Sequence, residues 1–126
     1  MRLLLDTHAY LWWLADDPQL RPAARAAIEA PQSVVHVSAA SIWEIAIKAQ
    51  LGRIGLRNAN LTAEIAANGF VELPIRAHHA QRAGALPRHH DDPFDRMLIV
   101  QAEMEQLVLV TLDRRLRVYG VELLET

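Results

Sequence analysis

Cysteine is absent from this chain of 126 residues. Disulfide frameworks and thiolate-bound metal sites are therefore excluded, and the absence favours a cytoplasmic protein. Long hydrophobic runs are also missing, since no apolar stretch reaches the ~18 residues of a membrane helix. The apolar start of the chain meets an acidic residue at Asp6, so we expect no signal peptide and no contact with a membrane.

An excess of charge of either sign is lacking too. The 13 Lys and Arg residues nearly balance the 15 Asp and Glu residues, which leaves a net charge of −2. This balance excludes a protein that binds nucleic acid through overall positive charge, so any such contact requires a local basic patch. The length and the 52% hydrophobic content predict a single domain, residues 1–126, with a substantial core.

What the sequence does contain is short apolar segments that alternate with helical patterns. Strands are expected at residues 3–5, 34–37, 70–74, 107–110 and 121–124. Helices are expected at residues 9–15, 23–30, 38–50, 61–67, 77–83 and 92–104, with a short one at 114–119. Such alternation indicates parallel βαβ units. The predicted fold is α/β, a three-layer α/β/α sandwich with a central parallel sheet of four to five strands.

Four acidic residues occupy equivalent places around this predicted sheet. Asp6 and Asp113 follow strands, Glu44 lies early in the helix after another strand, and Asp95 opens the helix that leads into a fourth. The carboxyl ends of parallel strands face the same edge of a sheet, where open α/β proteins bind their ligands. We therefore expect the four side chains to converge there.

Taken singly, each acid also has a purely structural explanation. Asp6 and Asp113 can cap the helices that follow them, and Asp95 can complete a reciprocal cap with Asp92. Glu44 has the spacing of a capping box and of a surface ion pair. Its partners in these two roles would be Ser41 and Lys48.

Carboxylates that crowd together repel and raise one another's pKa unless cations lie between them. Hard divalent ions prefer oxygen ligands, which favours Mg²⁺ or Mn²⁺, and the lack of cysteine argues against zinc. Such a site suits metal-assisted hydrolysis of phosphodiesters, in which two ions ~3.5–4 Å apart activate water and stabilise the leaving oxygen.

Four segments in this order carry a resemblance to a known family: LLLDTH at residues 3–8, SAASIWEI at 38–45, HDDPFDR at 90–96 and VTLD at 110–113. In them the chain resembles the PIN-domain ribonucleases and, within these, the VapC-type toxins of bacterial toxin–antitoxin pairs. The resemblance implies a PIN-like fold and a metal-dependent endoribonuclease that is neutralised by a cognate antitoxin. It further implies that Asp6, Glu44, Asp95 and Asp113 are the catalytic residues that hold the metal.

The resemblance extends to partners and neighbouring residues. It implies that Thr7 lies beside the acids, that RNA is the substrate, and that the protein forms a homodimer. The apolar helices at 9–15 and 61–67 support a dimer, because they exceed what a small core needs. By family analogy, residues 51–56 form a loop near the antitoxin. One departure is Asp91, where relatives often carry a basic residue.

Several other residues are weaker candidates for RNA contact. Arg96 and Arg114, and with them Arg115 and Arg117, lie next to the acids and could bind phosphates, although a solvated helix face explains them equally well. The pairs His78-His79 and His89-His90 should point apart on a helix, and are expected to be solvated or to line the RNA path. Trp12 and Trp13 are expected in the core, although one of them could face a partner, because adjacent positions of a helix point 100° apart.

Two other classes of function remain open from the residues alone. One is a phosphoryl-transfer domain that uses Asp6 as a covalent nucleophile, although such enzymes usually carry a second Asp two residues later, where this chain has His8. The other is a non-catalytic interaction module in which the acids are only helix caps.

Overall fold

Five parallel strands form one sheet in the order β3-β2-β1-β4-β5. The structure is a computed structural model that describes residues 1–54 and 60–126. The strands are β1 (Arg2–Leu5), β2 (Val34–Ser38), β3 (Val71–Leu73), β4 (Val108–Val110) and β5 (Leu123–Leu124). All five expected strands are thus confirmed, and β3 and β5 are shorter than expected.

Helices connect the strands at the expected places. They are α1 (Thr7–Leu14), α2 (Pro22–Glu29), α3 (Ala39–Gln50), α4 (Leu61–Ala67), α5 (Ala77–Ala85) and α6 (Pro93–Glu105). The turn after β4 is a 3₁₀ helix, η1 (Arg114–Tyr119). Five of these elements begin where a side-chain oxygen accepts a backbone N–H, as capping residues do. The caps are Asp6, Ser38, Asn60, Asp92 and Asp113.

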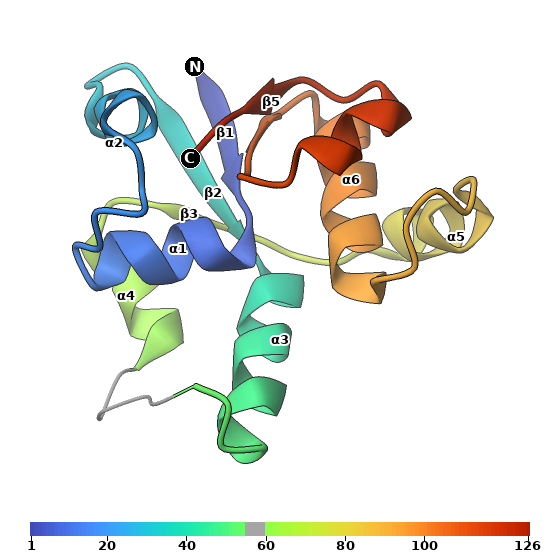
Figure 1. Ribbon diagram of the computed structural model, residues 1–126, viewed down its shortest axis with the longest axis horizontal. Coiled ribbons are helices and arrows are strands. Elements are labelled where there is room, and N and C mark those ends of the chain that lie inside the picture. The colour runs from blue at the N-terminus through green and yellow to red at the C-terminus, as the bar shows by residue number, and fades with distance from the viewer. Residues whose placement is uncertain (55–59) are drawn as a thin grey trace.

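The central strand β1 shows why the sheet is covered on both faces. Leu3 and Leu5 belong to one buried cluster with residues of α1, α2 and α4, whereas Leu4 belongs to another with residues of α6. Successive side chains of a strand point to opposite faces, so the three consecutive leucines of β1 require helices on both faces. Figure 1 shows the resulting three layers, with α1, α2 and α4 on one side of the sheet and α5 and α6 on the other. The predicted α/β/α sandwich is confirmed.

Helix α3 extends beyond the carboxyl ends of the strands and contacts both α1 and α6 (Figure 1). It follows β2 directly, with Ser38 as its cap, so the proposed capping box that begins at Ser41 is wrong. The loop expected at residues 51–56 reaches residues 55 and 56, which lie outside the described residues. None of the helices among the described residues has the length and apolar character needed to cross a membrane.

Helices α1 and α4 pack apolar side chains into the core, although residues 11–14 of α1 are only partly buried. Tyr10 is buried and donates its hydroxyl to the carbonyl of Leu61, 2.9 Å away, and Leu61 and Ile65 are buried as well. Trp13 lies against this core and donates Nε1–H to Asn68. The core therefore uses much of the apolar surface of these two helices, and the dimer stays a prediction.

Candidate active site

The four acids line one cavity of about 190 Å³ at the carboxyl edge of the sheet. Asp6 follows β1, Asp113 follows β4, Asp95 lies in the first turn of α6, and Glu44 lies in α3. The other residues of the lining are Thr7, His8, Lys48, Asp92 and Arg115. The convergence expected from the parallel sheet is therefore present in the structure.

Asp6 is a cap and a member of the cavity at the same time. Its Oδ1 accepts the N–H of Ala9 at 2.8 Å, while only 9% of the residue is exposed. Burial raises the pKa of this carboxyl to about 6, although hydrogen bonds from the Thr111 side chain and the Ala9 N–H lower it. Capping leaves the second carboxylate oxygen available, so the structural role of Asp6 does not exclude a chemical one.

Glu44 is buried, although its ion pair with Lys48 is the one expected on a helix surface. Its Oε1 accepts a hydrogen bond of 2.6 Å from the Thr7 hydroxyl, which also lies 3.1 Å from the Ser41 hydroxyl. Thr7 thus holds one oxygen of Glu44, and Lys48 binds the other. A buried carboxylate with two such partners has a defined orientation.

Asp95 does not complete a reciprocal cap with Asp92. Asp92 caps α6 by accepting the N–H groups of Phe94 and Asp95, but the Asp95 side chain turns to His90, with 2.8 Å between Oδ2 and Nε2. Burial raises the pKa of Asp95, the hydrogen bond with His90 opposes that rise, and the negative charges of Asp92 and Glu44 add to it. Its carboxylate is therefore free of any capping role.

Asp113 caps η1 and binds the side chain of Arg115. Its Oδ1 accepts the Arg115 N–H at 3.0 Å, and the guanidinium donates to both carboxylate oxygens at 2.9 and 2.8 Å. Hydrogen bonding with Arg115 lowers the pKa of Asp113. Asp113 therefore ionises more readily than an ordinary aspartic acid, whereas Asp6 and Asp95 ionise less readily.

The charges of the lining indicate that the cavity can hold cations. Five acids and two permanent cations, Lys48 and Arg115, line it, so the fully ionised cavity carries an excess of negative charge. Ligand atoms of His90, Asp95 and Asp113 all lie within 4.8 Å of one another. A divalent ion with oxygen ligands would offset the repulsion that the buried carboxylates experience.

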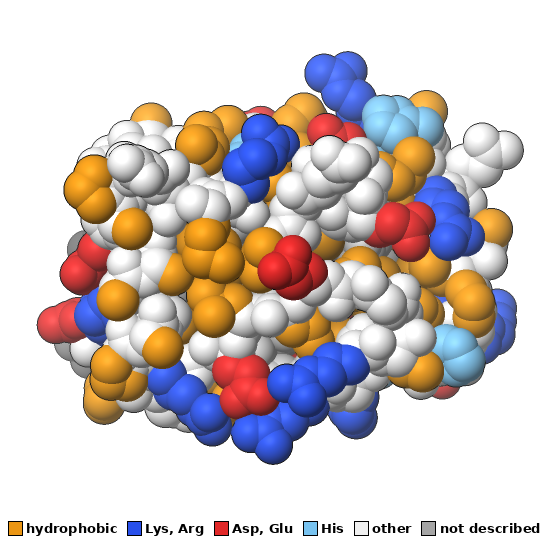
Figure 2. Space-filling model, turned by 90° about the horizontal axis from the view of Figure 1, so that it is seen from above, with side chains coloured by type: hydrophobic (Ala, Val, Ile, Leu, Met, Phe, Trp, Pro, Cys, Tyr) orange, Lys and Arg blue, Asp and Glu red, His pale blue; other side chains and the backbone are white. Residues whose placement is uncertain are grey.

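The arginines predicted to contact RNA have other partners in the structure. The guanidinium of Arg96 donates to four backbone carbonyls at 2.9–3.1 Å, one in the last turn of α5 and three in the connection between α5 and α6. Arg114 pairs with Glu125, together with Arg21 and Arg117. Their contact with RNA stays a prediction. Figure 2 shows Lys and Arg side chains gathered along one border of the face viewed from above.

A second group of possible metal ligands consists of His78, His79 and Glu105. The two rings do not point apart as expected, because their centroids lie 4.3 Å from each other and His79 is buried. His79 Nδ1 accepts the N–H of Arg76, which leaves the proton of the neutral ring on Nε2, where it is donated to Glu105 at 3.0 Å. With both ring nitrogens in use, this group caps a helix and joins α5 to α6.

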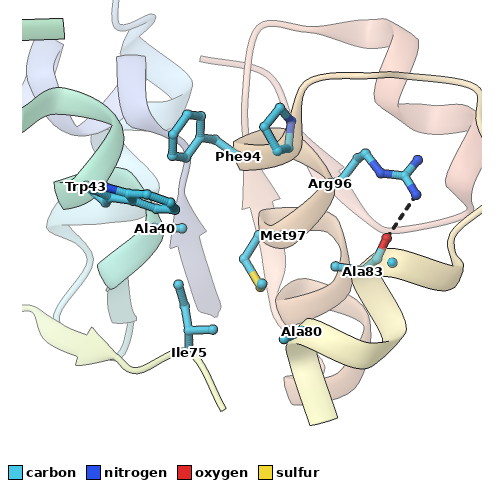
Figure 3. Close-up of a pocket in the computed structure, with 10 residues that line it drawn as sticks. Ala40, Trp43, Ile75, Ala80, Ala83, Phe94, Arg96 and Met97 are labelled. Carbon is cyan, nitrogen blue, oxygen red and sulfur yellow. Dashed lines mark hydrogen bonds between the residues drawn. The ribbon is translucent and has the colours of Figure 1, made fainter. Parts of the chain in front are cut away.

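An apolar hollow of about 300 Å³ lies between α3, α5 and α6, beside the acidic cavity but without a residue in common with it. Figure 3 shows Trp43 and Phe94 at one side of this hollow and Ile75, Ala80 and Met97 around it. The Trp43 and Phe94 rings meet edge to face at 5.4 Å, and Trp43 is 62% exposed.

Two participants in the site, His90 and Arg115, were not singled out from the sequence for the roles they have. The expected ion pair of Lys48 with Glu44 is present, but Glu44 is buried rather than at the surface. His90 was expected to be solvated or to line the RNA path, yet it binds Asp95. Arg115, rather than Arg114, binds Asp113. The spacing of Glu44 and Lys48 was a usable signal, whereas His90 and Arg115 depend on turns that bring them back to the acids.

Comparison with known proteins gives one family and several relatives. The family model of the PIN domain matches residues 3–122. The chain is 37% identical over 117 residues to Ribonuclease VapC22 of Mycobacterium tuberculosis, a match that covers 91% of this chain and 89% of the relative.

Two solved structures share the fold at low sequence identity. One is VapBC2 from Rickettsia felis bound to a DNA fragment from their promoter, with a TM-score of 0.74, 14% identity and coverage of 99% of this chain and 98% of the other. The second is a toxin–antitoxin complex from Klebsiella pneumoniae, with a TM-score of 0.59, 21% identity and coverage of 88% and 86%.

Proposed function

Since the chain belongs to the PIN domain family, we propose that it is an endoribonuclease toxin that hydrolyses RNA phosphodiester bonds and is neutralised by a cognate antitoxin. The observation that carries this proposal is the convergence of Asp6, Glu44, Asp95 and Asp113 on one cavity. Helix capping explains the positions of Asp6 and Asp113. Neither Glu44 nor Asp95 caps a helix through its side chain. A non-catalytic module in which the acids are only helix caps therefore does not explain the positions of Glu44 and Asp95.

We propose that the four acids are the catalytic residues and that they hold Mg²⁺ or Mn²⁺. Hard oxygen donors and the excess negative charge of the lining support this choice. When bound, the metal supplies activation of water and stabilisation of the leaving oxygen.

Other residues in and beside the cavity orient the acids and attract the substrate. Thr7 and Lys48 hold the two oxygens of Glu44, and His90 holds Asp95. The positive charges of Lys48 and Arg115 lie at the cavity lining, where they can attract an RNA phosphate that the carboxylates alone would repel. Arg115 can exchange an oxygen of Asp113 for that phosphate, since its side chain is 77% exposed.

The proposed partner is an antitoxin whose tail covers the acidic cavity. The relatives solved as toxin–antitoxin complexes support a partner of this kind, and a basic side chain from the tail would compensate the carboxylates when metal is absent. We also propose a homodimer, with the apolar hollow beside Trp43 as the contact between the two copies.

The test replaces one acid at a time by its amide and measures the cleavage of single-stranded RNA with Mg²⁺ or Mn²⁺ and with EDTA. Glu44→Gln and Asp95→Asn keep the shape of the side chain but remove a charged oxygen ligand, so cleavage should fall by orders of magnitude while the melting temperature holds or rises. Asp113→Asn should be the mildest, because a strand end can shift to let water replace a ligand.

Glu103→Gln is the matched control, since it removes one charge from the exposed far end of α6, where Glu103 pairs with Arg82. It should cleave like the wild type. Cleavage by the wild-type protein in EDTA would contradict a metal mechanism, and full activity of Glu44→Gln and Asp95→Asn would leave the acids with structural roles alone.

A further inference from the structure

A shallow cavity of about 350 Å³ adjoins the acidic one, and the side chain of Trp12 forms part of its wall. His8 and Leu112 complete the apolar and aromatic part of the lining, while Asp6 and Asp113 form its border. His8 lies one helical turn before Trp12, and the two ring centroids are 5.7 Å apart. Leu112 is 43% exposed. This cavity thus combines aromatic rings, an apolar side chain and two of the acids.

The two neighbouring tryptophans of α1, Trp12 and Trp13, differ in their contacts with the rest of the protein. Trp13 donates to Asn68, packs against Phe70 and lies 5.7 Å from the Arg25 guanidinium, so its position is explained by the fold. Trp12 packs against the core cluster with part of its ring, but its Nε1 has no hydrogen-bond partner among residues 1–54 and 60–126. A large ring that is held on one side and open on the other is a preorganised surface for another flat group.

The Trp12 cavity and the acidic cavity share Asp6, His8 and Asp113. A ligand that occupies both therefore needs a group suited to carboxylates and cations, and beside it a flat, uncharged group suited to an aromatic surface. A phosphate does not suit the Trp12 side, because Asp6 and Asp113 border it and neither Lys48 nor Arg115 lines it. A nucleotide has both parts, since its phosphate can lie at the acidic cavity while its base lies against Trp12.

We propose that Trp12, with His8 and Leu112, forms a stacking site for one unpaired nucleobase next to the phosphate that is cleaved. This inference rests on the proposed ribonuclease function and adds a positioning role that the acids do not supply. Every base has a π-face, so the site accepts any base and selects for single-stranded RNA, because a paired base cannot turn out of its stack without cost.

An apolar side chain of the antitoxin is the other class of occupant for the same surface. The border of carboxylates favours the base, because carboxylate oxygens can accept further hydrogen bonds from the N–H groups of a base edge. An aliphatic side chain would displace water from Asp6 and Asp113 without offering a donor. The experiment below separates the two occupants.

The test compares Trp12→Leu, Trp12→Phe and Trp13→Leu in the cleavage of unstructured single-stranded RNA. Trp12→Leu keeps an apolar side chain against the core but removes the stacking face, so KM should rise about 10-fold with kcat largely retained, within the range that stacking of one base contributes. Trp12→Phe should lie between Trp12→Leu and the wild type. Trp13→Leu disturbs the same helix without touching the cavity, so it should lower the melting temperature and leave KM unchanged.

A binding measurement tests stacking directly. In the Glu44→Gln variant, which should bind RNA without cleaving it, a single-stranded oligonucleotide that contains 2-aminopurine should lose fluorescence on binding. The loss should be absent when Trp12→Leu is added. An unchanged KM in Trp12→Leu, or quenching that persists without Trp12, would overturn the inference.

The outcomes also separate this inference from the function on which it rests. If the wild-type protein cleaves no RNA, the proposed function fails. If it cleaves RNA and Trp12→Leu loses only its neutralisation by the antitoxin, Trp12 is an antitoxin contact and the stacking site is wrong.

Discussion

At the scale of single residues, the cost of ionising Asp6 links the candidate site to stability. Its pKa is about 6 in the folded protein against 3.8 for a free side chain. At pH values between these two pKa values, Asp6 keeps its proton in the folded protein and loses it in the unfolded chain. The stability from this neutral form is complete below about pH 4 and is lost as the pH rises through about 6.

Asp6→Asn should therefore stabilise the metal-free protein at pH 7.5. Asn keeps an oxygen that can cap α1 but never ionises, and the shift in pKa converts to an increase of at most about 3 kcal/mol in the free energy of unfolding. The increase should disappear below about pH 4. Urea unfolding in EDTA between pH 4 and 8 measures it.

Asp113→Asn provides a control of opposite sign. Arg115 lowers the pKa of Asp113, so this acid stabilises the fold above its unfolded pKa and that contribution is lost as the pH falls through its folded pKa. The Asp113→Asn variant should then be less stable than the wild-type protein at neutral pH. An Asp6→Asn variant no more stable than the wild type at pH 7.5 would mean that burial of Asp6 costs nothing.

At the scale of elements, Arg96 joins α5 to α6 through the backbone of the segment between them. Its four acceptors are the carbonyls of Ala83, Leu86, Pro87 and His90. His90 in turn binds Asp95. Arg96 therefore supports the site through the path of the chain.

Arg96→Gln should lower the free energy of unfolding by about 2 kcal/mol, because one charged donor is lost from several carbonyls. It should also speed amide hydrogen exchange in residues 86–90. Arg82→Gln is the control, since Arg82 joins the same two helices through an exposed ion pair with Glu103, and its loss should cost less than about 1 kcal/mol. Equal effects of the two substitutions would contradict the supporting role of Arg96.

The same elements show how far the sequence could predict the structure. The strands, the helices and the caps at Asp6, Asp92 and Asp113 have local signals, and parallel pairing makes the four acids converge. The partners of those acids have no such signal. Whether Arg114 or Arg115 meets Asp113 depends on η1 being a 3₁₀ turn, with three residues per turn rather than the 3.6 of an α-helix. His90 reaches Asp95 only because of the path that Arg96 supports.

At the scale of the whole molecule, the largest exposed aromatic group lies beside an apolar hollow. Trp43 is 62% and Ile75 39% exposed, and both line the hollow shown in Figure 3. Exposed apolar groups next to a concave apolar surface are typical of protein interfaces, in which aromatic residues are enriched. The hollow shares no residue with the acidic cavity, so two copies can meet there while both cavities stay open.

The wild-type protein should therefore have twice the 14.2 kDa mass of one chain in light scattering coupled to size exclusion, and Trp43→Arg should have the mass of a monomer. Arginine at this position would bring two like charges together across a two-fold axis and remove the aromatic contact. Val118→Arg is the control, because Val118 is 56% exposed on η1, away from the hollow, and should leave the dimer intact. A wild-type mass of one chain, both alone and with the antitoxin, would contradict the dimer. A dimer that survives Trp43→Arg would place its interface on another face, and the exposure of Trp43 would then call for a different partner.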